Sequence, residues 1–92
     1  MEILHTDDGK KGAFTAMEES TEAGVMTYVW AGPDKFIIEH TIGNPDFKGV
    51  GMKLLDKAVA FAREKNLKII PLCPFAYKMF QRKPEIHDVL SQ

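Results

Sequence analysis

Apolar and polar residues alternate along much of the first half of the chain, and apolar residues recur every three or four positions after residue 49. Alternation with a period of two is typical of a half-buried strand, whereas the longer spacing is typical of a helix. The alternating stretches are rich in β-branched and aromatic residues, which favour strands. They predict strands over residues 13–19, 25–30 and 35–42.

Turn-forming residues separate these strands. Ser20–Gly24 predicts a hairpin loop of about five residues. Ala31–Asp34 predicts a second turn, because Pro fixes its own φ while Gly and Asp tolerate turn geometry. Ahead of them, Ile3 and Leu4 predict the start of a short edge strand, and the polar stretch over residues 7–12 predicts a loop.

Helices are predicted in the second half of the chain. Residues 50–65 carry apolar side chains on one helical face and charges on the other, and Asn66 follows as a terminating residue. Leu67–Cys73 then predicts a short, mostly apolar strand. Pro74 suits the first position of a second helix, and a last helical turn is expected around residues 85–90.

The order of these elements defines the fold class as α+β (mixed α/β). An antiparallel meander is followed by a βαβ unit, whose crossover makes the last strand parallel to the strand ending at Ile42. Ligands of open sheets bind beyond the carboxyl ends of the strands, so Ile42 and Cys73 are expected near one ligand site. Residues 1–92 are expected to form a single domain.

Gly49-Val50-Gly51, at the start of the first predicted helix, is the segment that most directly suggests chemistry. Glycine lets the backbone approach a ligand closely, and the first amides of a helix bind anions such as phosphate. No Ser, Thr, Asp or Asn stands where a capping side chain would satisfy these amides. The alternative is that the glycines only allow a tight turn, since neither a Rossmann nor a Walker motif is completed.

Composition narrows the class of partner. Twelve Lys and Arg oppose thirteen Asp and Glu, and the formal charge of −1 with a pI near 6.3 gives no reason to expect nucleic acid binding. No membrane-spanning stretch or secretory signal is recognised, so a cytoplasmic location is expected. Cys73 is the single cysteine and the three histidines are scattered, so neither a disulfide nor a metal site is predicted.

Three segments carry a family resemblance: His40-Thr41, Gly49-Val50-Gly51-Met52-Lys53-Leu54-Leu55 and Pro71-Leu72-Cys73-Pro74-Phe75. With these segments in this order, the chain resembles the small, single-domain members of the GNAT superfamily of N-acetyltransferases over about residues 13–90. The superfamily signature is [Gln/Arg]-x-x-Gly-x-[Gly/Ala]. Here Asp46 occupies the Gln/Arg position, and Phe47 stands where the small members often have Gly.

The resemblance implies that the protein transfers an acetyl group from acetyl-CoA to an amine acceptor, such as a protein or a polyamine. It implies a coenzyme A site in which backbone amides hold the pyrophosphate, while the pantetheine arm lies between splayed strands ending near Ile42 and Cys73. The residues expected to bind the cofactor are Thr41, Ile42, Lys48, Gly49, Val50, Gly51, Met52, Lys53, Phe75 and Met79.

Cys73 and His40 are the residues expected to take part in catalysis. Cys73 is either a buried core residue or, at the mouth of a helix that favours the thiolate, a nucleophile. His40 is either a general base or substrate contact, or a structural residue, and strand alternation places Glu39 on the opposite face. In larger relatives a tyrosine protonates the departing thiolate. Phe80 stands at that position, which leaves Tyr77 as a fallback donor.

Two other functions stay open at this point. One is a non-catalytic acyl-CoA-binding or regulatory module, and the other is an interaction domain without a cofactor. Larger relatives carry extra helices between their first two strands, where this chain has only Ser20–Gly24. The acceptor site is therefore expected to be open or to be completed by a partner chain, and the protein to be a monomer or a weak homodimer.

Overall fold

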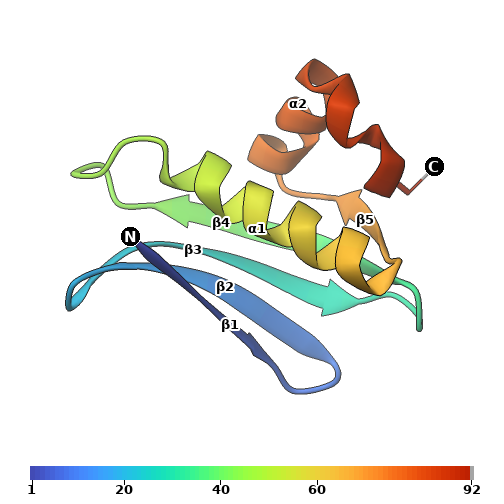
Figure 1. Ribbon diagram of the computed structural model, residues 1–92, viewed down its shortest axis with the longest axis horizontal. Coiled ribbons are helices and arrows are strands. Elements are labelled where there is room, and N and C mark those ends of the chain that lie inside the picture. The colour runs from blue at the N-terminus through green and yellow to red at the C-terminus, as the bar shows by residue number, and fades with distance from the viewer. Residues whose placement is uncertain (92) are drawn as a thin grey trace.

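The computed structural model describes residues 1–91, one residue fewer than the predicted domain. The elements are β1 (Glu2–Asp7), β2 (Lys11–Glu18), β3 (Thr21–Trp30), β4 (Lys35–Gly43), α1 (Val50–Lys65), β5 (Lys68–Pro71), α2 (Pro74–Arg82) and the 3-10 helix η1 (Pro84–Val89). Helix α1 crosses one face of the sheet, and α2 follows β5 (Figure 1). Within residues 1–91, no helix is long and apolar enough to cross a membrane.

The strands lie side by side in chain order, β1-β2-β3-β4-β5. The first four pair antiparallel, whereas β5 pairs parallel with β4, from Lys35 opposite Lys68 to Ile38 opposite Pro71. Parallel neighbours need a crossover connection, which α1 supplies. The predicted meander followed by a βαβ unit is therefore confirmed.

The core lies between α1 and one face of the sheet. Alternate strand residues point into it, and the largest of them are Phe14, Met26, Tyr28, Phe36, Ile38 and Ile69. The buried face of α1 meets them with Val50, Leu54, Leu55, Ala58, Val59 and Ala62. Burial of one large apolar side chain stabilises a fold by about 1.5–3 kcal/mol, so this face is what holds α1 in place.

Two strand boundaries differ from the prediction at the start of the sheet. Strand β1 is longer than the short start expected, because it pairs with β2 along its whole length of six residues. Only Glu19 and Ser20 separate β2 from β3, instead of a five-residue loop. Glu19 has a left-handed φ of 57°, which closes the turn within two residues.

The elements that follow α1 also end differently. Strand β5 is shorter than predicted because its neighbours cap helices: the Leu67 N–H donates to the Ala62 carbonyl at 2.7 Å, and Cys73 is the N-cap of α2. Pro74 begins α2, as predicted. The last predicted helical turn is a 3-10 helix.

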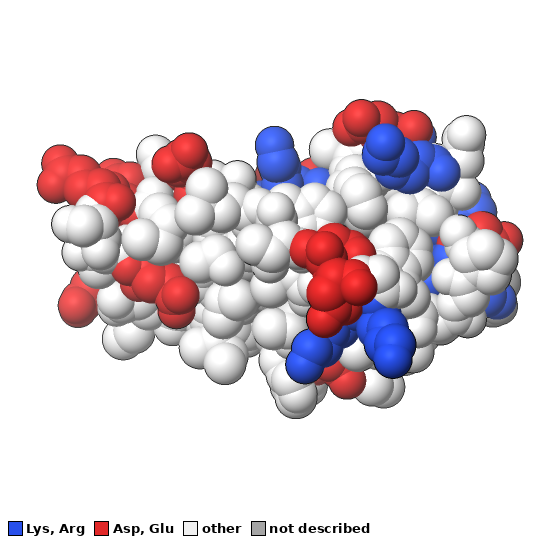
Figure 2. All heavy atoms as spheres, turned by 90° about the horizontal axis from the view of Figure 1, so that it is seen from below, with Lys and Arg blue, Asp and Glu red and all other residues white. Residues whose placement is uncertain are grey.

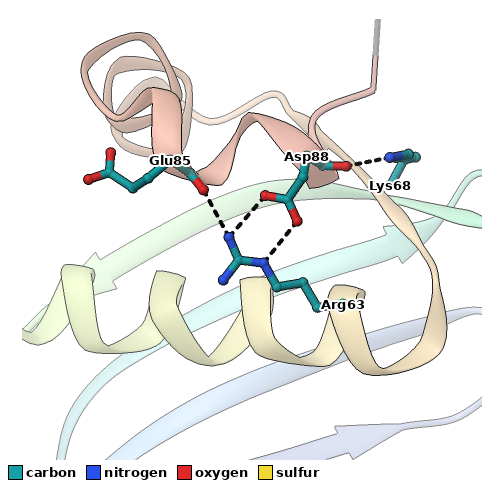
Figure 3. Close-up of polar contacts among 4 residues, drawn as sticks. All are labelled: Arg63, Lys68, Glu85 and Asp88. Carbon is teal, nitrogen blue, oxygen red and sulfur yellow. Dashed lines mark hydrogen bonds and ion pairs between the residues drawn. The ribbon is translucent and has the colours of Figure 1, made fainter.

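Polar contacts tie the end of α1 to η1 and β5 (Figure 3). The Arg63 guanidinium donates to both carboxylate oxygens of Asp88, each at 2.9 Å, and to the Glu85 carbonyl at 2.9 Å. Lys68 donates to the Asp88 carbonyl. A two-pronged pair at the surface fixes geometry more than it adds stability, so this cluster orients η1 against α1.

Tyr28 ties β1 to the middle of the sheet. Gly12, its partner on β2, leaves room for the ring, because a Cβ there would lie 2.4 Å from the Tyr28 hydroxyl. This hydroxyl donates to Asp7 Oδ2 at 2.5 Å and lies 2.6 Å from His5 Nε2. Trp30 Nε1 donates to the same Asp7 oxygen at 2.8 Å. The edge strand is thus held through side chains as well as by its ladder.

Asp7→Asn is expected to lower the free energy of unfolding at neutral pH. It should also make that free energy decrease less steeply as the pH is lowered. Burial raises the pKa of Asp7, but hydrogen bonds from Tyr28, the Gly9 amide and Trp30 outweigh this effect and lower it below the ordinary value. A carboxylate of this kind stabilises the fold above its unfolded pKa, and the contribution is lost as the pH falls through the folded pKa. Urea unfolding between about pH 7 and pH 2 measures the slope.

Asp56→Asn makes the same chemical change at an exposed position on α1 and is the matched control. If the free energy of unfolding decreased equally steeply toward low pH in Asp7→Asn and in the parent protein, a stabilising role for this carboxylate would be contradicted.

Candidate functional site at the start of α1

The loop between β4 and α1 is fixed by its own hydrogen bonds. The Asn44 N–H donates to the Ala23 carbonyl of β3 at 2.8 Å. The Asn44 side-chain Oδ1 accepts from the Asp46 N–H at 2.9 Å. The Asn44 backbone carbonyl accepts from the Phe47 N–H at 3.0 Å. Asn and Asp stabilise turns in this way because their side chains bond the backbone two residues on. These hydrogen bonds hold the loop in a turn directly before α1.

The N-terminus of α1 has no capping side chain. Gly49 is the N-cap in a left-handed conformation, with φ of 74°, which glycine adopts without steric cost. The Lys53 N–H bonds the Gly49 carbonyl at 3.2 Å, but residues 1–91 supply no acceptor for the N–H groups of residues 49–52. Together with the helix dipole, such groups form a binding site for an anion.

Charges around this end of the molecule differ in sign. Lys48 and Lys53 are exposed next to the free amides. Figure 2 shows acidic side chains without basic neighbours at the end where Figure 1 places the β2–β3 turn, and Glu18, Glu19 and Glu22 are exposed there. Lys48 and Lys53 thus place positive charge beside the start of α1, where it would complement a bound anion.

Gly51 brings α1 and α2 into contact. A Cβ at Gly51 would lie 2.8 Å from Phe75 Cζ, so the absence of a side chain is what allows the ring to lie against α1. Phe75 and Met79 of α2 and Met52 of α1 are partly buried and pack against the core. All three are predicted cofactor residues, and Phe75 is the one shown to approach α1, at Gly51.

Strands β4 and β5 part beyond Ile38. The Ile38 carbonyl accepts from both the Leu72 N–H at 3.1 Å and the Cys73 N–H at 3.0 Å, and the strand ladder ends there. Strand β4 continues to Gly43 with β3 as its paired neighbour. We call this region, residues 39–43 of β4 and Leu72–Cys73 after β5, the fork.

Cys73 and Thr41 face each other across the fork. Cys73 Sγ lies 3.2 Å from Thr41 Oγ1 and accepts from the Ala76 N–H at 3.3 Å, which caps α2. The prediction that Cys73 sits at the mouth of a helix is confirmed. The residue is only 4% exposed, so its sulfur is part of the core as well as of the fork.

A β-bulge in β4 changes how Glu39 and His40 are presented. Ile38 pairs with Tyr28 and Thr41 pairs with Met26, so both intervening residues lie opposite Thr27. The prediction that alternation separates Glu39 from His40 therefore does not hold here, because the extra residue interrupts the alternation. His40 is exposed and Glu39 is half-buried.

The other residues singled out in the sequence differ in how exposed their side chains are. Ile42 is 63% exposed at the end of β4, and Val50 is buried under α1. Asp46 is exposed, and Phe47 is partly buried against the core, which gives this departure from the family signature a packing role. On α2, Phe80 is buried and Tyr77 is 54% exposed. Within residues 1–91, no group of three or more His, Cys, Asp or Glu side chains is placed to hold a metal ion.

Comparisons with known proteins show the family of this chain. The model of the GCN5-related N-acetyl-transferase family matches residues 13–89. An NMR solution structure of a GCN5-like candidate N-acetyltransferase from Staphylococcus aureus superposes with a TM-score of 0.72 at 31% sequence identity, covering 96% of this chain and 87% of that chain. No curated protein sequence matches. The chain belongs to the GCN5-related N-acetyltransferase (GNAT) superfamily.

Gly49→Ala is expected to destabilise the protein by about 1–2 kcal/mol, the usual cost of a side chain in the left-handed region. No atom lies within 4 Å of the added Cβ, so the cost is conformational. Gly43→Ala is the matched control, because it also meets nothing within 4 Å and its φ is not positive. Equal free energies of unfolding for the two variants in urea would contradict the requirement for glycine at residue 49.

Proposed function

We propose that this protein is an N-acetyltransferase that uses acetyl-CoA and transfers the acetyl group to an amine. The observation that carries the proposal is the uncapped start of α1, with free amides at residues 49–52, next to a sheet that divides after Ile38. A diphosphate suits helix N-terminal amides, and an extended arm suits the space between parted strands.

The residues proposed to bind the cofactor are Thr41, Ile42, Lys48, Gly49, Val50, Gly51, Met52, Lys53, Phe75 and Met79. The amides and the two lysines would hold the negatively charged end, and the apolar side chains would line the arm. Bound in this way, acetyl-CoA supplies an acetyl group that is already activated as a thioester. The chain's task is then to orient the acceptor and to manage its proton.

Two side chains at the β4 bulge are candidates to take the proton that the acceptor amine loses. His40 is exposed, whereas Glu39 is half-buried, and they are the two residues after Ile38, the last residue of β4 that pairs with β5. A general base must come within hydrogen-bond distance of the amine, and the fork offers both groups that opportunity. The acceptor proposed for this reaction is a small polyamine or an amine on a protein.

Cys73 offers a second route. Its sulfur would take the acetyl group while coenzyme A leaves as a thiol, and the amine would then take the acetyl group from the sulfur. Because Cys73 is 4% exposed, the covalent route requires the sulfur to be uncovered first. This burial favours direct transfer to the amine.

Titration with coenzyme A tests the cofactor site. Amide resonances of residues 48–53 are expected to shift in ¹H–¹⁵N NMR spectra, and saturation at a hundred times Kd should add about 2.7 kcal/mol of stability. Binding without turnover on a panel of amines would favour an acyl-CoA-binding or regulatory module. Unmoved resonances with no thermal shift would contradict both functions and favour an interaction domain.

Intact-mass measurement after incubation with acetyl-CoA separates the two chemical routes. Direct transfer predicts no stable adduct and retained turnover in Cys73→Ala and in Cys73→Ser, whose hydroxyl can still cap α2. An adduct of about 42 Da that disappears in both variants together with turnover would instead establish Cys73 as the nucleophile.

A further inference from the structure

A hollow of about 380 Å³ lies on the sheet, and its lining includes Thr6, Asp8, Lys11, Thr27 and Glu39. Thr27 stands between the buried residues Met26 and Tyr28, so its side chain is on the face turned away from the core. The volume falls within the range of about 300–1,000 Å³ that is usual for small-molecule sites. The hollow is therefore large enough for a ligand distinct from the cofactor.

Two of the polar groups lining the hollow have no partner within residues 1–91. Thr27 Oγ1 is buried and makes no hydrogen bond, which is costly for a hydroxyl unless a ligand supplies the partner. The Glu39 carboxylate has no hydrogen bond or ion pair in the same part of the chain. Asp7, also at the hollow, is by contrast occupied by Tyr28 and Trp30.

The charge of the lining favours a cation. Three carboxylates, Asp7, Asp8 and Glu39, line the hollow with one cation, Lys11. An ammonium group carries three donors and no acceptor, which matches a carboxylate and a hydroxyl that are both able to accept, as Glu39 and Thr27 are. A carboxylic acid or phosphate would instead face unfavourable charge at Glu39.

The hollow also reaches the fork. Glu39 lines it and directly follows Ile38, the last β4 residue that pairs with β5. A ligand that donates to Glu39 would therefore lie next to the point where the two strands part. This is where an acceptor for the proposed acetyl transfer has to be presented.

We infer that the hollow binds the aliphatic primary ammonium group of the acceptor through Glu39 and Thr27. The inference rests on the proposed function, because it names the substrate class of the same reaction. The ammonium group belongs either to a free polyamine or to a lysine side chain, which present the same chemistry to these two residues.

Binding without acetyl-CoA tests the inference directly. Putrescine and Nα-acetyl-lysine methylamide serve as probes, with sodium butyrate as the anionic control, and ¹H–¹⁵N NMR reports where they bind. We expect at least one of the two amines to shift the amide resonances of Ala13, Thr27 and Glu39. The amine with the lower Kd identifies whether the acceptor is a free polyamine or a lysine side chain. Shifts for neither amine, or equal shifts with butyrate, would overturn the inference.

Thr27→Val gives the sharper variant, because it keeps the shape and removes the unpartnered hydroxyl. Its stability should be equal or higher, while the Kd for the amine should rise about tenfold. Glu39→Gln should weaken amine binding as well, whereas Glu64→Gln, an exposed carboxylate on α1, should not. Unchanged amine affinity in both Thr27→Val and Glu39→Gln would refute the assigned contacts.

The same spectra separate this inference from the proposed function. Coenzyme A shifts at residues 48–53 without amine shifts at the hollow would refute the acceptor site and leave the cofactor site standing. Amine shifts at the hollow with no response to coenzyme A would support an amine site and refute acetyl transfer.

Discussion

The division of the sheet depends on one carbonyl group. Ile38 accepts hydrogen bonds from two successive residues after β5, and Pro71, which has no N–H, ends the ladder beside it. Strand β4 then continues while the other chain turns into α2. This carbonyl therefore lies where β4 leaves β5, one residue before the bulge of β4 and next to the N-cap of α2. A slip of one residue in the pairing would exchange the faces of every residue beyond it.

The two ends of α1 differ in whether their backbone groups are capped. At its C-terminus, Asn66 is left-handed and its N–H bonds the Ala62 and Arg63 carbonyls, while Arg63 and Lys65 add positive charge to the last turn. At its N-terminus no side chain among residues 1–91 caps the amides, although Asn44 holds the preceding loop in place. Groups that are rigid yet unsatisfied lose little entropy when a ligand arrives, which is the basis of preorganised binding.

Sequence periodicity was sufficient to predict the order of elements, because the apolar positions along the strands and α1 report directly on burial. Gly49 and Pro74 likewise marked helix starts through local backbone preferences. The bulge at Glu39 could not be predicted, since it arises from pairing with Thr27 on another strand. The hollow and the contact between Tyr28 and Asp7 also join residues distant in sequence, and no local pattern encodes such contacts.

The contacts of Leu90 and Ser91 with β5 have a consequence for self-association. Leu90 forms a parallel bridge with Ile69 of β5, and the Ser91 N–H donates to the Ile69 carbonyl at 2.9 Å. An uncovered outer strand invites strand addition by a second molecule, and proteins commonly block it with a short segment of their own chain. Here Leu90 and Ser91 occupy part of that position, so intermolecular sheet extension through β5 would first have to displace them.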